Sequence, residues 1–183
     1  MITNFDYLKN ESKFSSFASV AISAEKIILM DPEASIINSR RAMEFAIKWM
    51  YSVDKELEMP YQDNLQSLMN AEDYRQIVGP DLWKRMDYIR RCGNNVAHSN
   101  KKLGRDEAML CLENLFIYLD YIAYCYSDQY EERTFNQGLI RLNLCDGNII
   151  LVLSNIVLCL CLVILQLIIF QFRFLPGGRK QFV

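Results

Sequence analysis

The sequence predicts an all-α domain, an antiparallel bundle of long helices with shorter helices between them, followed by a C-terminal hydrophobic helix. Three observations predict this fold class. Apolar residues recur at spacings of three and four through most of the first 140 residues. No stretch before Ile140 shows the alternation that is typical of strands. The chain of 183 residues has 7 glycines and 4 prolines, which leaves long stretches free to form helices.

Two long helices are predicted before Pro60. The first has one apolar face, made by Phe14, Phe17, Ala21, Ala24 and Ile28. Asp31 is the predicted N-cap of the second helix, with Pro32 at the first helical position and Glu33 favourable to the helix dipole. The apolar face of this second helix consists of Ala42, Ala46, Trp49 and Val53, widened by Met43, Phe45 and Met50.

The middle of the chain predicts shorter helices around residues 65–69 and 74–77, and then a break at Gly79-Pro80. Pro80 restarts a helix that we expect to end at Gly93, because glycine suits the left-handed position after a helix. Asn94 and Asn95 would continue that turn. The last long helix begins at Asp106-Glu107, and its apolar face is Ala108, Leu112, Leu115, Leu119, Ile122 and Tyr126.

Composition and motifs exclude several classes of site. The apolar content of 51% and charged content of 23% are typical of a folded protein. Six cysteines and a single histidine show no metal-ligand spacing, so the sequence predicts no metal site. Cysteines within apolar helical stretches behave as small hydrophobes, which favours a reducing compartment. P-loop, dinucleotide, serine-nucleophile and EF-hand motifs are absent, and no cofactor is predicted.

The character of the chain changes near Ile140. Residues 148–172 carry no charge and are long enough to cross a bilayer, and a basic tail follows at 173–183. The N-terminus has no basic region followed by an apolar run, so no secretory signal is predicted. The simplest expectation is a cytoplasmic helical domain with a tail anchor in the membrane. The alternative is that this segment is the out-of-frame remnant of a longer gene.

Positive charge gathers around the single histidine, His98. Seven of the 22 residues at 84–105 are basic and one, Asp87, is acidic, although the whole chain has a net charge of −2. One interpretation is a tight turn between two helices, surrounded by solvated lysines and arginines. The other is a site for phosphate, in which nucleic acid would bind Arg90, Arg91, Lys101, Lys102 and Arg105.

The same segment could also support catalysis. Cleavage of RNA without a metal needs a group that transfers protons and a positive charge that stabilises the phosphate. His98 could act as the general acid or base, because histidine titrates near neutral pH. Arg91 could hold phosphate oxygens in a bidentate contact, and Asn94 could donate a hydrogen bond to the same group.

Several longer motifs together resemble one uncharacterised helical domain. They are FDYLKNESKFSSFASVAISAEK, SRRAMEFAIKWMYSVDKEL, PYQDNLQSLM, GNNVAH and DEAMLCLENLFIYLDYIAYCY. This combination is similar to the domain at the N-terminus of type I restriction enzyme R subunits and related helicase proteins. The resemblance covers residues 4–135, so 136–147 is a predicted linker. That domain in turn resembles the HEPN group of helical bundles.

Three functional readings are open, and the resemblance implies the first two. The first is a non-catalytic accessory domain of a restriction or defence system that binds nucleic acid or a partner subunit. The second is a metal-independent ribonuclease, since many HEPN proteins form dimers and carry an arginine followed, after four to six residues, by a histidine. Arg91 and His98 have six residues between them, and Asn94 matches a polar position within that pattern. The third is a membrane-tethered scaffold that only dimerises.

Two features of the last long helix suit a partner surface. Five tyrosines crowd its end and the residues after it, namely Tyr118, Tyr121, Tyr124, Tyr126 and Tyr130. Residues 106–132 contain seven acids and no basic residue, which gives this part of the domain a charge opposite to that around His98. These features suit a dimer or inter-domain contact, and a plain solvated acidic face is the alternative. Together with the resemblance, they give a homodimer or restriction-system subunits as the expected partners.

Overall fold

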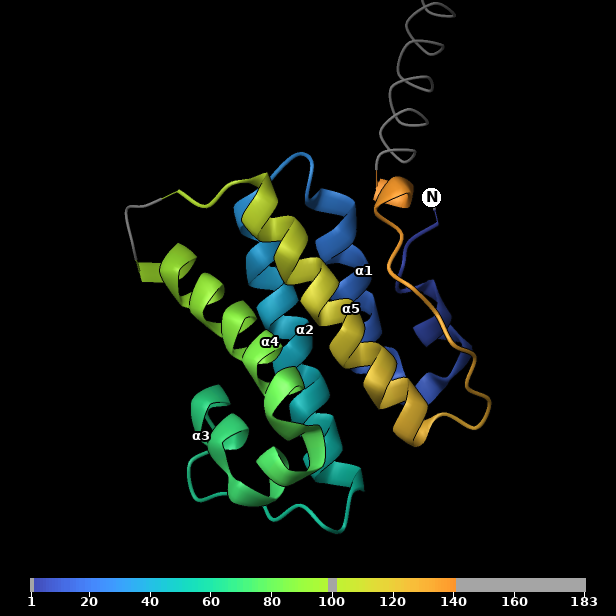
Figure 1. The fold of residues 1–183 in the computed structure, drawn as a ribbon, viewed down its shortest axis with the longest axis vertical. Helices are drawn as coiled ribbons and strands as arrows, with labels where there is room; N and C mark the ends of the chain where they lie inside the picture. Colours follow the sequence, from blue (N-terminus) through green and yellow to red (C-terminus); the bar gives the residue numbers. More distant parts are fainter. Residues whose placement is uncertain (1, 99–101, 141–183) are drawn as a thin grey trace, which may run out of the picture. The chain divides into compact units, whose positions relative to one another are not determined.

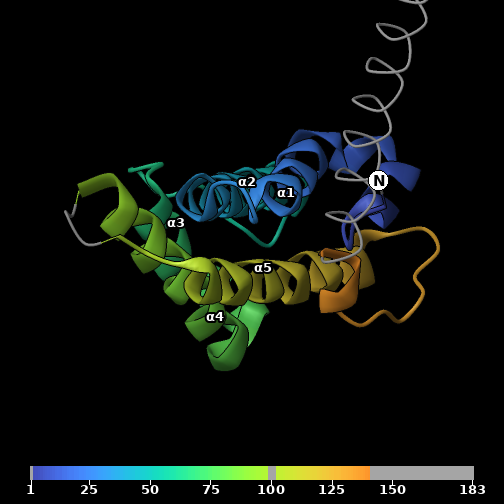
Figure 2. The same ribbon diagram turned by 90° about the horizontal axis from the view of Figure 1, so that it is seen from above.

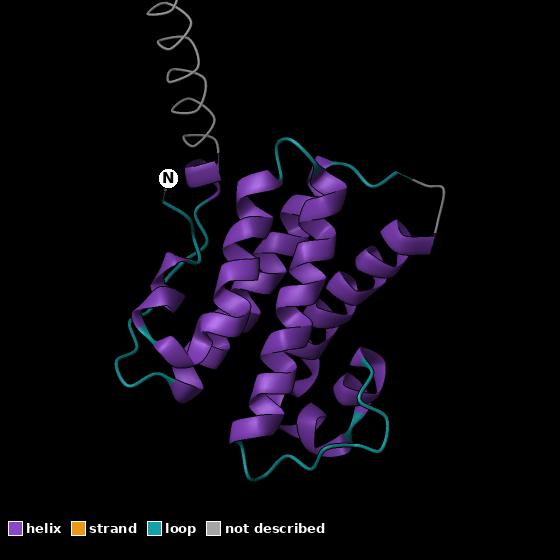
Figure 3. Ribbon diagram, turned by 180° about the vertical axis from the view of Figure 1, so that it is seen from behind, coloured by secondary structure: helices purple, strands orange, loops and turns teal. Residues whose placement is uncertain are grey.

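The structure is a computed structural model of the 183-residue chain, and it describes residues 2–98 and 102–140. These residues belong to one unit and form helices and loops, with no strand among them (Figure 3). The predicted all-α class is confirmed. The predicted membrane segment 148–172 and the basic tail 173–183 lie outside the described residues, as does most of the predicted linker 136–147.

Within the described residues, five α-helices build the domain, preceded by two short 3-10 turns and followed by a helical segment at 137–140 (Figure 1). The elements are η1 (Asp6–Asn10), η2 (Ser12–Phe14), α1 (Ser15–Ile27), α2 (Pro32–Val53), α3 (Leu65–Asn70), α4 (Glu72–His98) and α5 (Arg105–Tyr126). Helices α1 and α2 form one layer, and α4 and α5 form the other (Figure 2). Helix α2 contacts both helices of the second layer, and α3 packs against α4.

The predicted start of α2 is confirmed at atomic detail. The Asp31 carboxylate accepts a hydrogen bond from the backbone N–H of Ala34 at 2.9 Å, and Pro32 occupies the first turn.

The predicted break before Pro80 is also present. Gly79 has φ 71° and ψ 168° within α4, a conformation that glycine adopts without steric cost, so α4 consists of two segments joined by a kink.

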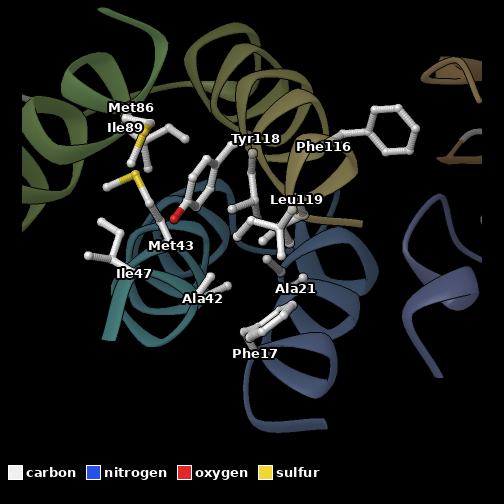
Figure 4. Packing of buried hydrophobic residues seen from close by; sticks show 14 of the residues in the cluster. Phe17, Ala21, Ala42, Met43, Ile47, Met86, Ile89, Phe116, Tyr118 and Leu119 are labelled. Carbon is white, nitrogen blue, oxygen red and sulfur yellow. The ribbon is translucent and has the colours of Figure 1, made fainter. Parts of the chain in front are cut away.

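The core lies where the two layers meet (Figure 4). Its centre includes Met43 and Ile47 of α2, Met86 and Ile89 of α4, and Leu119 of α5. Most of the predicted face of α2 is buried, but the prediction is wrong for Phe45 and Val53, which are 38% and 47% exposed. Val53 is the last residue of α2, so no further helical turn covers it.

Most of the tyrosines predicted for a partner surface instead make contacts within the domain. Tyr118 is fully buried, and its hydroxyl lies 2.8 Å from that of Tyr74 in α4. Tyr121 donates a hydrogen bond to the carbonyl of Ile77, which ties α5 to the segment before the kink. Tyr124 is the most exposed of the group, at 66%. Since buried hydroxyls need such partners, most of these tyrosines are explained within the domain.

Helix α5 is long and apolar enough to cross a membrane, with a mean hydropathy of 1.3 over its most apolar stretch. Among the described residues no other helix meets this test, and 56% of that stretch is buried within the domain. The packing of α5 against α2 and α4 accounts for its apolar character.

A buried carboxylate joins the beginning of the described chain to its end. Glu25 in α1 accepts hydrogen bonds from the backbone and side-chain N–H groups of Asn4, at 2.9–3.1 Å. The Asn4 side chain also exchanges two hydrogen bonds with the backbone of Asn136. Burial raises the pKa of Glu25 to about 7, although the N–H groups of Asn4 act in the opposite direction.

Because of the raised pKa of Glu25, we expect the stability of the domain to depend on pH. Because the pKa of Glu25 is about 7 in the folded state and near 4.5 in the unfolded state, the folded state binds the proton more tightly. The contribution of Glu25 to stability is therefore present below about pH 4.5 and is lost as the pH rises towards 7. We expect the unfolding temperature of wild type to fall more steeply between about pH 5 and 7.5 than that of Glu25→Gln. Parallel profiles would contradict this assignment, and Glu58→Gln, at an exposed position, serves as the control.

Candidate functional site

The second segment of α4 carries the residues that the sequence singles out, and it extends beyond its predicted end. The prediction that Gly93 terminates this helix is wrong, because α4 continues through Asn94 and Asn95 to His98. Gly93 is buried against α2, and a Cβ atom there would lie 2.3 Å from Cδ of Arg40. The glycine is therefore explained by the close approach of a side chain from α2, and not by a left-handed helix end.

The continuous helix changes how the site is assembled. Arg91, Asn94 and His98 are related by steps of three and four, so they share one face of α4. Seven residues of helix place the backbones of Arg91 and His98 about 10 Å apart along the axis. The Arg91 side chain is 69% exposed, His98 is exposed and Asn94 is partly buried. Helical periodicity, and not a turn, places these groups together on one face.

Asp87 lies one turn before Arg91 and binds two arginines. Its carboxylate accepts from Nη2 of Arg90 at 2.7 Å and forms an ion pair with Nε of Arg91 at 2.6 Å. Asp87 is 5% exposed, and the Arg90 side chain is 18% exposed. Arg90 thus serves as the partner of a buried acid, whereas Arg91 keeps most of its surface in solvent.

The other predicted basic residues are divided between described and undescribed positions. Lys102 and Arg105 are exposed just before and at the start of α5, while Lys101 lies outside the described residues. The backbone N–H of Leu103 donates to the Glu33 carboxylate at 3.2 Å, which fixes this segment to the start of α2. Lys84 is also exposed, and its ion pair with Asp81 is at the surface.

Two small cavities flank the Arg91 side chain, and no motif in the sequence predicts them. One has a volume of about 110 Å³ and is lined by Gln66, Met69, Asn70, Trp83, Asp87, Arg90 and Arg91. The other has a volume of about 260 Å³ and is lined by Trp83, Lys84, Asp87, Tyr88 and Arg91. The spacing of Trp83, Asp87 and Arg91, four residues apart on one helix, is the signal that could have revealed this grouping.

A larger cavity of about 440 Å³ lies at the kink of α4 and includes none of the predicted site residues. Its lining is mostly apolar, with Val78, Ile117 and Tyr121 among its walls. Arg85 also lines it, but its guanidinium donates to the side-chain oxygen of Asn114 at 3.0 Å. Asp81, the other charged residue of the lining, pairs with Lys84, so both charged groups at this cavity are engaged within the domain.

Cys92 is next to Arg91 in the chain but faces the bundle. A hydrogen bond from the Cys111 thiol of α5 lowers the pKa of Cys92 to about 7, against the effect of burial. The same interaction and burial raise the pKa of Cys111. Both thiols are free and buried, so they form part of the core.

Across residues 2–98 and 102–140, no three histidine, cysteine or acidic side chains gather in a metal-binding arrangement.

Comparisons with known proteins identify one family. No curated protein matches the chain significantly. No solved structure matches it significantly either. A family model described as a domain of unknown function, DUF4145, matches residues 23–137, which include α2 to α5 and every described residue of the candidate site. Because this match covers more than half of the sequence, the chain belongs to the DUF4145 family.

Proposed function

We propose that the exposed face of α4 from Lys84 to His98 binds the phosphate backbone of single-stranded nucleic acid. The observation that carries this proposal is the alignment of Lys84, Arg91 and His98, which are seven residues apart on one continuous helix. All three side chains belong to exposed residues. Arginine and lysine are the residues that neutralise phosphates in nucleic-acid complexes.

The charges on this face show which side chains must supply the affinity for phosphate. The C-terminal end of a helix carries a partial negative charge, which opposes the approach of phosphate near His98. Asp87 also offsets one of the two adjacent arginines. Affinity must therefore come from the side-chain charges of Lys84 and Arg91, with Lys102 and Arg105 extending the positive surface.

The salt dependence of binding tests this proposal. Each phosphate contact to a single strand contributes about 0.7 to the slope of log affinity against log salt. We expect Lys84→Gln/Arg91→Gln to reduce that slope by about 1.4 and to weaken binding at low salt. Lys26→Gln, at an exposed position of α1 in the other layer, should change neither quantity. An unchanged slope in the double variant would refute the proposal.

The biological role that we propose is that of a non-catalytic accessory domain in a restriction or defence system, where nucleic acid or a partner subunit binds this face. The resemblance of WMYSVD, PYQDNL and GNNVAH to the N-terminal domain of restriction R subunits supports it. A bundle of the HEPN type is compatible with the observed helices.

Metal-independent cleavage of RNA is the second candidate, and the common face of Arg91, Asn94 and His98 favours it. On that reading His98 transfers the proton, Arg91 stabilises the phosphate and Asn94 donates a hydrogen bond. Incubation of the full chain with labelled single-stranded RNA in EDTA separates the two candidates. Cleavage by wild type and not by His98→Ala would establish the ribonuclease, whereas retained salt-sensitive binding without cleavage is the result that our proposal expects.

A further inference from the structure

The 260 Å³ cavity beside Arg91 combines two kinds of side chain that a phosphate alone would not need. Trp83 and Tyr88 provide aromatic surface, and Lys84 and Arg91 provide two cations at the same cavity. Trp83 and Tyr88 are partly buried and pack against the core, so their rings are held by the domain. The cavity lies at the N-terminal end of the face that we propose to bind phosphate.

Trp83 is fixed in orientation by two further contacts. Its indole Nε1–H donates to the carbonyl of Met69 in α3 at 2.8 Å. The guanidinium of Arg75 lies 4.7 Å from the centre of the indole ring. Trp83 also lines the smaller cavity beside Arg91. A ring held in this way loses little conformational entropy when a ligand packs against it.

We propose that this cavity receives an unpaired nucleobase of a single-stranded nucleic acid, stacked on Trp83, with Lys84 and Arg91 contacting the flanking phosphates. This inference rests on the proposed function and names the ligand of the same site. A cavity of about 260 Å³ is smaller than those that take drug-sized ligands, and it suits one base better than a whole nucleotide.

The lining of the cavity favours a base over an acidic peptide. Asp87 lines the cavity, but its two oxygens are already engaged by Arg90 and Arg91, so this carboxylate is not free to bind a ligand. Trp83 and Tyr88 offer aromatic surface on which a base can stack, while the phosphates of the same strand can pair with Lys84 and Arg91. Stacking tolerates any base, so we expect single-stranded RNA and DNA both to bind.

Tryptophan fluorescence of the full chain tests the proposal directly. The chain has two tryptophans, and Trp49→Phe leaves Trp83 as the single fluorophore. Trp49 packs among Phe14, Phe17 and Tyr126, so phenylalanine retains an aromatic ring there. We expect single-stranded oligonucleotides to quench Trp83, whereas double-stranded RNA of equal length and inorganic polyphosphate should not, since they offer no unpaired base. Equal quenching by polyphosphate would overturn the proposal.

Affinity measurements on variants complete the test. Trp83→Leu should weaken binding of single-stranded RNA at least about fivefold without changing the salt slope, and Trp83→Phe should retain most of the affinity. If Trp83→Leu has no effect while Lys84→Gln/Arg91→Gln still reduces the slope, the stacking site is refuted and phosphate binding stands. If wild type binds no single strand at all, both proposals fail. The quenching experiment does not depend on whether Trp83→Leu folds.

Discussion

Replacing Asp87 with asparagine is expected to destabilise the domain and, at the same time, to tighten its binding to RNA. Asp87 is buried and pairs with Arg90, whose side chain is itself mostly buried. Loss of the carboxylate leaves that guanidinium with a weaker partner, so we expect the free energy of unfolding to fall by about 2–3 kcal/mol. The ion pair of Asp87 with Arg91 adds little to this loss of stability, because the Arg91 side chain is largely exposed.

The gain in affinity follows from the ion pair between Asp87 and Arg91. In the native protein, the Arg91 guanidinium is shared between this carboxylate and any phosphate that approaches it. In Asp87→Asn, Arg91 is released from the carboxylate and one negative charge leaves the binding face. We expect the affinity for single-stranded RNA to rise about fivefold, which corresponds to about 1 kcal/mol.

Asp128→Asn is the matched control for this pair of effects. It makes the same change in net charge, but Asp128 is 90% exposed and pairs with Lys13, outside α4. We expect it to alter neither stability nor RNA affinity by a comparable amount. Weaker RNA binding by Asp87→Asn, measured under conditions where the variant is folded, would show that phosphate does not approach Arg91.

Replacing Gly93 with alanine is expected to destabilise the domain by up to about 2 kcal/mol. The new Cβ atom would meet the Arg40 side chain at 2.3 Å, and such overpacking costs about 1–3 kcal/mol. The higher helix propensity of alanine offsets about 1 kcal/mol of this cost. Denaturant unfolding of the two proteins measures the difference.

A double-mutant cycle with Arg40→Ala distinguishes this explanation from a helix end at Gly93. Once the Arg40 side chain is removed, Gly93→Ala should become stabilising by up to about 1 kcal/mol, because only the gain in propensity is left. A glycine in the left-handed conformation would instead make Gly93→Ala destabilising in both backgrounds. That second outcome would contradict a helix that continues through Gly93.

Local signals in the sequence are sufficient for most helix boundaries. The Asp31-Pro32 start and the Gly79-Pro80 break depend on residues adjacent in the chain, and both are present in the structure. Gly93 provides the same kind of local signal, but it does not end a helix. The glycine is present there for another reason. The side chain that requires a glycine there belongs to Arg40, in a helix far earlier in the chain, and no local pattern reports such a contact.

The candidate site is predictable in its residues but not in its geometry. The charge pattern identifies Arg91 and His98, but it cannot show that Arg90 turns towards the buried Asp87. Trp83 is not part of this charge pattern, and its spacing from Asp87 and Arg91 is equally typical of a core aromatic residue. Its place at the smaller cavity depends on the packing of α3 against α4, which follows from the tertiary fold.

Hydrogen–deuterium exchange of the full chain, with and without single-stranded RNA, tests the central claim most directly. The account predicts that RNA slows exchange in the peptides that cover residues 83–98 and leaves the exposed face of α1 unchanged. The same experiment with Lys84→Gln/Arg91→Gln should lose that protection. Protection confined to other helices, or none at RNA concentrations that saturate binding, would contradict the assignment of α4 as the nucleic-acid-binding surface.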